Sequence, residues 1–132
     1  SMGAADGAMA LTIDYVKERK AFGQSIAQFQ NTRFKLAELK TQMELCRSYI
    51  EQCKVRYREG KMTTEEASSL KRSATQMECK VVDECLQLFG GYGYTLEYPI
   101  SRFYVDARVQ TIYAGTSEIM KEVISRGMVG RG

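Results

Sequence analysis

Three short stretches carry residue types that could do chemistry. Residues 114–116 (Ala-Gly-Thr) stand just before a helical pattern, so their backbone N–H groups favour an anion or a developing oxyanion. The glycines of "GGYG" (90–93) follow a long helical pattern and allow the backbone to approach a ligand closely. Arg19 and Phe22 combine a partner for phosphate with an aromatic surface. Each stretch also has a purely structural explanation, as a helix cap, a turn or a surface arginine. The residues alone therefore predict a helical protein with a candidate anion site.

Several other chemistries are disfavoured. The chain has no histidine, so a Ser-His or Cys-His nucleophile cannot form within it. Its four cysteines (Cys46, Cys53, Cys79 and Cys85) show no CxxC spacing, and we expect buried free thiols in a reducing compartment rather than a zinc site. "GGYG" follows a helix, whereas a dinucleotide-binding glycine motif follows a strand. Most carboxylates are expected on solvated helix faces.

Charge and length limit the classes of partner. A chain of 132 residues predicts one domain with one core. The net charge of +3 is scattered, with no block of like charges, so we expect no nucleic-acid partner and no binding to membrane surfaces. No apolar run approaches a membrane span, and no leader pattern opens the chain. Ser1 and Met2 resemble a cloning scar.

Two long helices must position the glycine stretch. Apolar residues spaced by alternating threes and fours predict a helix over residues 31–59, ended by Gly60. Thr63 and Glu66 match a capping box that opens the next helix, and the short connection makes the two helices antiparallel neighbours. The first apolar stripe is Leu36, Leu39, Met43, Cys46, Ile50, Cys53 and Tyr57. The second is Ala67, Leu70, Ala74, Met77, Val81, Cys85 and Leu88, widened by Val82, Leu86 and Phe89.

Shorter helices flank this pair. We predict one over residues 3–19, one from Pro99 to about Gln110, and a last helix capped by Thr116. In that last helix Ile119, Val123 and Ile124 are expected to face inward. No segment alternates long enough to predict a strand. The predicted fold is all-α, an antiparallel four-helix-type bundle of about five helices.

Three motifs in order resemble the C-terminal helical domain of the flavin-dependent acyl-CoA dehydrogenases. They are "YVKERKAFGQSIAQFQ" (15–30), "CLQLFGGYGYTLEYPISRFYVDARV" (85–109) and "IYAGTSEI" (112–119). The resemblance covers essentially the whole chain. It is strongest to the long-chain and isovaleryl branches, in which the position of Ala114 is also occupied by a small residue.

The resemblance implies oxidation of an acyl-CoA thioester to the trans-2-enoyl-CoA. A carboxylate removes the α-proton, FAD accepts the β-hydride, and electron-transferring flavoprotein reoxidises the cofactor. Residues 1–132 would form a single domain that also builds a homodimer or homotetramer, with the family's N-terminal helical and middle β domains absent. The location would be the bacterial cytoplasm or the mitochondrial matrix.

The resemblance also assigns site residues. FAD contacts would come from Arg19, Phe22, Gln30, Gln87, Leu88, Phe89, Gly90, Gly91, Thr116, Ser117 and Glu118. Of these, residues 87–91 would receive the adenosine diphosphate part of a neighbouring subunit's FAD. Tyr113, Ala114 and Gly115 would border the thioester, with the N–H of Ala114 bonded to its carbonyl oxygen.

The catalytic base is the position at which this chain departs from many members. They carry a glutamate where this chain has Ala114. In the branches with a small residue there, the base is a glutamate on the domain's first helix, at a position upstream of residue 1. Glu97, Asp106 and Glu118 are poor substitutes, so we expect no catalytic residue in this chain and no activity from it alone.

Other readings on the same fold stay open. They are a non-catalytic assembly module, an acyl-CoA oxidase and a nucleic-acid-binding relative. A glutamate upstream would favour the dehydrogenase, oxygen consumption the oxidase, and salt-dependent binding the nucleic-acid relative.

Overall fold

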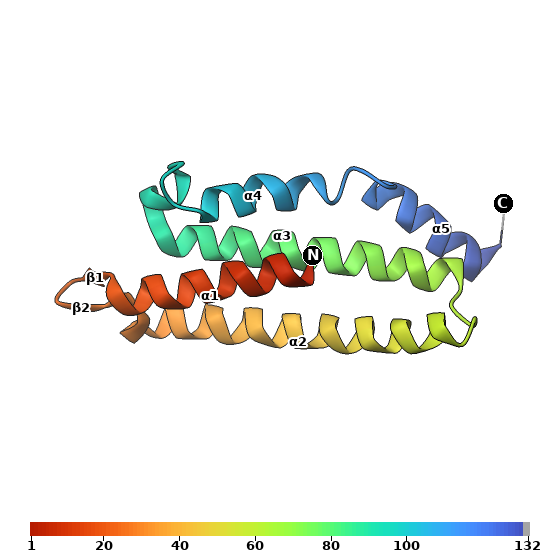
Figure 1. Ribbon diagram of the computed structural model, residues 1–132, viewed down its shortest axis with the longest axis horizontal. Helices are drawn as coiled ribbons and strands as arrows, with labels where there is room; N and C mark the ends of the chain where they lie inside the picture. Colours follow the sequence, from red (N-terminus) through yellow and green to blue (C-terminus); the bar gives the residue numbers. More distant parts are fainter. Residues whose placement is uncertain (131–132) are drawn as a thin grey trace.

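The computed structural model describes residues 1–130 and confirms the all-α prediction (Figure 1). Its helices are α1 (Met2–Glu18), α2 (Gln30–Arg58), α3 (Thr64–Phe89), α4 (Ile100–Val109) and α5 (Ser117–Val129). Between them lie a short hairpin, β1 (Lys20–Ala21) with β2 (Gln24–Ser25), and the 3-10 helices η1 (Ile26–Gln28) and η2 (Gly90–Tyr94). No helix among residues 1–130 is long and apolar enough to cross a membrane.

The connection between α2 and α3 forms as the sequence predicts. Gly60 has a φ of 67°, the left-handed conformation that glycine adopts without strain after a helix. The Thr63 hydroxyl accepts a hydrogen bond from the Glu66 amide at 3.2 Å, and the Glu66 carboxylate accepts one from the Thr63 amide at 2.9 Å. This reciprocal capping box fixes the start of α3, which returns antiparallel to α2 (Figure 1).

Helix α3 is the centre of the bundle. Figure 1 shows α1 and α2 on one side of it and α4 and α5 on the other. Fully buried Val81, Val82 and Cys85 lie on α3, which therefore has apolar neighbours on both sides. The remaining core residues are Ala5, Ala8, Met9, Leu39, Met43, Cys46, Met77, Phe89, Ile100 and Ala107. All four cysteines are free thiols, as predicted.

Some predicted details are wrong. Tyr57, expected in the α2 seam, is 75% exposed, and Ala67, expected in the α3 stripe, is also exposed. Ile119, expected inside, is 53% exposed, because α5 turns the side carrying Ser117 toward the bundle. The hairpin was not predicted, because strands of two residues are too short for alternation to be seen.

One carboxylate lies in the core. Glu78 on α3 is 1% exposed, and its Oε2 has no hydrogen-bond partner among residues 1–130. A buried carboxylate oxygen without a partner is unusual in a protein core.

Candidate functional site

The hairpin after α1 presents Arg19 and Phe22. The Arg19 amide closes the last turn of α1 on the Tyr15 carbonyl at 2.8 Å, and its own carbonyl accepts from Ile26 at 2.8 Å. At the two-residue tip, Phe22 and Gly23 have φ values of 51° and 80°, the positive pair of a type I′ hairpin turn. Phe22 is 97% exposed, and its ring meets Phe29 edge-on at 6.3 Å. The strained turn therefore holds an aromatic side chain out in solvent.

Arg19 lies at the edge of a cavity of about 570 Å³, here called the glycine cavity. It opens between the end of α1, the hairpin and the junction of α3 with η2. The lining residues are Tyr15, Arg19, Ala21, Ile26, Gln87, Leu88, Phe89, Gly90, Gly91, Tyr92 and Thr95. At Gly90 and Gly91 an added Cβ would meet no atom within 4 Å, so the backbone is open to a ligand there.

Aromatic rings form one wall of the glycine cavity. Tyr15 stacks on Phe89 with ring centroids 4.0 Å apart and an interplanar angle of 17°. Tyr92 stacks on Tyr98 at 5.2 Å. Burial raises the pKa of the Tyr15 phenol, an effect that nearby Arg19 partly opposes, so the phenol stays protonated and donates to the Phe89 carbonyl at 3.4 Å. The wall therefore consists of packed aromatic rings.

The components of the glycine cavity fit a ligand with two different parts. The Arg19 guanidinium suits a phosphate, and the open backbone at Gly90 and Gly91 allows close approach by a bulky group. The Tyr92 ring, 45% exposed, adds an apolar surface to the lining beside Arg19 and can contact a heterocycle along its exposed edge. An adenosine diphosphate moiety combines these two parts.

The second candidate region is the turn between α4 and α5. Ala114 and Gly115 have φ values of 52° and 96°. Among residues 1–130, Ala114 and Phe22 are the only non-glycine residues with positive φ, and both were predicted as site residues. Such backbone outliers concentrate at functional sites, where the surrounding structure holds them.

The turn leaves a backbone donor available. The Tyr113 amide bonds to the Val109 carbonyl at 3.2 Å, and the Ser117 amide bonds to the Thr111 carbonyl at 3.1 Å. Between them, the amide of Ala114 has no acceptor within residues 1–130, and Ala114 itself is exposed. This N–H can therefore donate to a bound carbonyl oxygen.

Helix α5 begins directly after the turn. The Thr116 hydroxyl accepts from the Ile119 amide at 3.2 Å, which confirms the predicted cap. Ser117 is buried and Glu118 is exposed. Glu118 therefore points to solvent and forms its ion pair with Lys121, at 3.8 Å.

The structure places most of the predicted residues in two separate regions. Arg19 and residues 87–91 share the glycine cavity, whereas Phe22 lies at the hairpin tip and is not among the lining residues. Residues 113–116 form the turn, and Ser117 and Glu118 begin α5. Gln30, the exposed first residue of α2, lines neither. Helix α4 lies between η2, whose residues line the glycine cavity, and the turn (Figure 1), and its ten residues correspond to about 15 Å.

Several functional candidates were missed by sequence reasoning. Tyr15, Ala21, Ile26, Tyr92 and Thr95 also line the glycine cavity. Tyr15 and Tyr92 belong to the motifs quoted above, so their aromatic character next to Arg19 and the glycines was the available signal.

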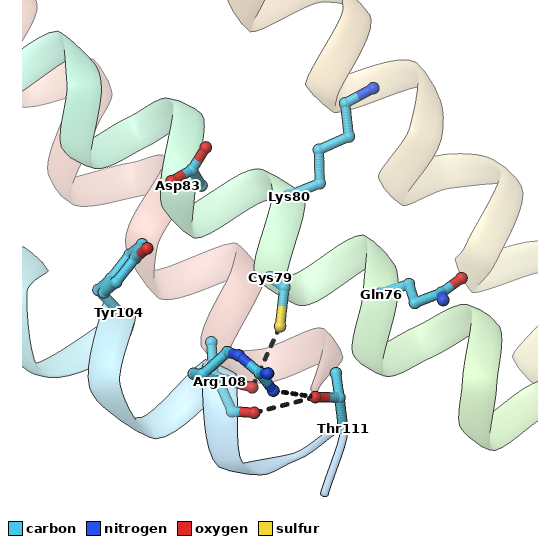
Figure 2. Close-up of a pocket in the computed structure, with 8 residues that line it drawn as sticks. Gln76, Cys79, Lys80, Asp83, Tyr104, Arg108 and Thr111 are labelled. Atoms are coloured by element: carbon cyan, nitrogen blue, oxygen red, sulfur yellow. Dashed lines mark hydrogen bonds between the residues drawn. The ribbon is translucent and has the colours of Figure 1, made fainter. Parts of the chain in front are cut away.

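A third hollow lies between α3 and α4. Figure 2 shows its lining, with a volume of about 410 Å³. Cys79 donates to the Ala107 carbonyl at 3.2 Å, and Arg108 donates to Thr111 at 2.6 Å. The side chains of Lys80 and Asp83 point away from this pair (Figure 2). Because its polar groups do not converge, this groove is not the candidate site.

Comparison with known proteins supports the resemblance. Residues 1–129 match the family described as acyl-CoA dehydrogenase, C-terminal domain. The chain is 48% identical over 118 residues to the mitochondrial long-chain specific acyl-CoA dehydrogenase of Mus musculus, which covers 89% of this chain and 27% of that protein. It is 40% identical over 125 residues to the caffeyl-CoA reductase-Etf complex subunit CarC of Acetobacterium woodii, covering 95% of this chain and 33% of that protein.

A solved structure agrees with the fold. Glutaryl-CoA dehydrogenase from Mycobacterium smegmatis, in complex with FADH2, matches with a TM-score of 0.91 at 27% identity, over 98% of this chain and 34% of that chain. The chain thus spans about a third of the length of these relatives, between 27% and 34%. The family prediction is confirmed, and the 48% identity agrees with its long-chain branch.

Proposed function

The chain belongs to the acyl-CoA dehydrogenase family, as its C-terminal domain, and we propose that it serves as the FAD-binding and oligomerisation domain of a longer enzyme that oxidises acyl-CoA thioesters to trans-2-enoyl-CoA. The observation that carries this proposal is the α4–α5 turn. In this turn the backbone of Ala114 is left-handed, and its amide has no acceptor among residues 1–130. The family to which the chain belongs is named for acyl-CoA thioesters, whose carbonyl oxygen such an amide can bind.

In the proposed reaction the Ala114 amide donates to the thioester carbonyl oxygen. Removal of the α-proton moves negative charge onto that oxygen, so a fixed donor stabilises the transition state more than the substrate. A backbone donor needs no side chain at position 114, and alanine there is compatible with the chemistry. Tyr113 and Gly115, on either side, would border the thioester.

The base is proposed to be a glutamate upstream of residue 1. Ala114 has no carboxylate, and Glu118 is exposed and faces Lys121. Glu97 and Asp106, on other segments, are exposed as well. We therefore propose that the 132-residue chain alone does not turn over substrate.

FAD, when bound, supplies the acceptor for the β-hydride. The glycine cavity would hold its adenosine diphosphate part, through Arg19, residues 87–91 and the hairpin with Phe22; Gln30 would contact it from the start of α2. Thr116, Ser117 and Glu118 would line the flavin. A relative determined with FADH2 supports this cofactor.

The separation of the two regions supports a shared arrangement between subunits. Helix α4 lies between η2, whose residues line the glycine cavity, and the turn (Figure 1). We therefore propose that the cavity and the turn contact two different FAD molecules in a homodimer or homotetramer. Each cofactor would then lie at a subunit boundary. The alternative function is a non-catalytic assembly module. In that case the domain would still form the oligomer, but the Ala114 amide would not bind a thioester.

Electron-transferring flavoprotein is the proposed electron acceptor, supported by the relative that belongs to an Etf complex. The proposed location is the bacterial cytoplasm or the mitochondrial matrix, since one relative is mitochondrial and another is bacterial.

The test is a flavin spectrum of the full-length protein. We expect stoichiometric FAD whose absorbance is bleached anaerobically by at least one acyl-CoA in a panel of short, medium, long and branched chains. The 132-residue chain, as a control, should not be bleached. A full-length protein that carries flavin but is not reduced by any member of the panel would contradict the proposed reaction.

A further inference from the structure

A lysine from another helix contacts the α4–α5 turn. Lys71 lies on α3, and its Nζ donates a hydrogen bond to the carbonyl oxygen of Gly115. The contact is partly buried and joins residues separated by 44 positions in the sequence. No other lysine or arginine side chain donates to the backbone of residues 113–118 in the described part of the chain.

The turn needs such a contact because its backbone is unfavourable by itself. Ala114 and Gly115 both lie at positive φ, and for alanine this conformation is rare. An α-carbon substituent at Gly115 would meet the Met120 methyl at 2.5 Å, so the turn already packs closely against α5. A left-handed pair persists only where neighbouring groups determine it.

Two hydrogen bonds fix the turn from opposite ends. The Ser117 amide bonds to the Thr111 carbonyl and closes the loop, whereas Lys71 holds the carbonyl of Gly115 and thus the peptide plane that follows Gly115. A bond from a charged donor is stronger than one between neutral groups, and partial burial reduces its competition with water. When this peptide plane is fixed, the backbone dihedral angles of Ala114 and Gly115 have less freedom to rotate. The direction of the Ala114 amide is therefore fixed as well.

We propose that Lys71 is a positioning residue: it holds the Ala114–Gly115 turn so that the Ala114 amide points at the thioester oxygen during α-proton removal. This inference rests on the proposed function of the turn. Lys71 does not itself touch the substrate in this proposal, and it acts through the Gly115 carbonyl.

The experiment compares three variants of the full-length protein. Lys71→Met removes the charged donor while keeping an unbranched side chain, and Lys71→Arg keeps a charged donor. Lys80→Met, exposed on the same helix, is the matched control. We measure FAD content, melting temperature, kcat, KM, the isotope effect with α-deuterated acyl-CoA, and hydrogen exchange of amides 110–120.

For Lys71→Met we expect kcat per bound FAD to fall about 10-fold to 100-fold, the scale of a small misplacement of a reacting group. KM should change little, because the lost interaction acts in the transition state. The α-deuterium isotope effect should rise, and the hydrogen-bonded amides of Tyr113 and Ser117 on either side of the turn should exchange faster. Lys71→Arg should recover most of the lost rate, and Lys80→Met should match the wild type.

A structural role alone would lower the melting temperature and leave kcat per bound FAD and the isotope effect unchanged, and that result would overturn the inference. Unchanged exchange at the hydrogen-bonded amides of Tyr113 and Ser117 in Lys71→Met would overturn it as well. If the wild type does not oxidise any acyl-CoA, the proposed function fails, and the exchange measurement still decides whether Lys71 fixes the turn.

Discussion

The guanidinium carbon of Arg19 lies 5.2 Å from the centre of the Tyr92 ring. The two residues are far apart in the sequence: Arg19 directly follows α1, and Tyr92 lies in η2, which follows α3. The ring attracts the cation, and the stacked pair of Tyr92 and Tyr98 limits where the cation can go. An exposed arginine is thus oriented at the edge of the glycine cavity before any ligand arrives.

Replacing either member of this pair should weaken FAD binding in the full-length protein. We expect Arg19→Leu to raise the dissociation constant at least about 10-fold, which corresponds to about 1.4 kcal/mol, because the phosphate partner is lost. Tyr92→Leu should have a smaller effect and Tyr92→Phe little, since phenylalanine keeps a ring face. The measurement is a fluorescence titration of apoprotein with FAD.

Arg33→Leu, exposed on α2, is the control for the loss of one positive charge. Equal weakening by Arg33→Leu and Arg19→Leu would indicate general charge attraction in place of a specific contact.

Gly115 should not tolerate a side chain. Alanine there would combine a φ of 96° with a methyl group 2.5 Å from Met120. We expect Gly115→Ala to lower the free energy of unfolding by about 1–3 kcal/mol. Gly3→Ala, in α1 with open space around it, should leave stability unchanged or raise it by up to about 1 kcal/mol. Urea unfolding of both variants measures the difference, and equal midpoints would contradict the strained turn.

The capping box should make stability depend on pH. Two hydrogen bonds to the Glu66 carboxylate lower its pKa below the ordinary value: the larger effect comes from the Thr63 amide and the smaller one from the Arg56 side chain. The ionised Glu66 carboxylate therefore contributes its full stabilisation at pH values above the pKa that Glu66 has in the unfolded chain. This contribution is lost as the pH falls through the lower pKa that Glu66 has in the folded protein. Glu66→Gln should have a lower urea midpoint than wild type at neutral pH, with the difference disappearing in acid.

Thr63→Ala separates the cap from the charge. It should cost about 1 kcal/mol by removal of the hydroxyl acceptor, and part of that cost should persist in acid because the threonine hydroxyl does not titrate. A Glu66→Gln difference that stays constant from neutral to acid pH would show that the carboxylate charge plays no part.

The helices could be predicted from the sequence because apolar spacing and capping motifs depend only on residues that are close together in the chain. The α2 helix was expected over 31–59 and runs from Gln30 to Arg58, and Gly60 ends it in the expected conformation. Thr63 and Glu66 correctly predicted the start of α3, and Thr116 correctly predicted the start of α5. Spacing and capping act over one helical turn, so one sequence suffices to read them.

Long-range relationships were not readable in this way. Lys71 reaches Gly115 across 44 residues, and Tyr92 faces Arg19 from another helix. The Phe22-Gly23 hairpin lacks the Asn-Gly or Asp-Gly signal of its turn type, so its positive φ at Phe22 could not be expected. Ile119 was misplaced because apolarity alone does not tell which side of a short helix meets its neighbour. The motifs supplied the candidate site residues, which stay predictions, and the packing around α3 determines how these residues are grouped.

The last prediction concerns Ala114 and the base in the full-length enzyme. We expect removal of the proposed upstream glutamate to abolish turnover, and Ala114→Glu in that background to restore part of it. Many family members carry the carboxylate at this turn, and a general base can act from either side if it reaches the α-proton. Ala114 already has a φ of 52° and is exposed, so glutamate adds no new backbone strain and has room for its side chain. Recovery should be incomplete, because the new carboxylate has neither a tuned pKa nor packed neighbours that fix its rotamer. It should also shift the preferred chain length, since glutamate fills space that alanine leaves open. Steady-state oxidation of an acyl-CoA panel measures both effects, and an upstream variant that keeps full activity would refute this assignment of the base.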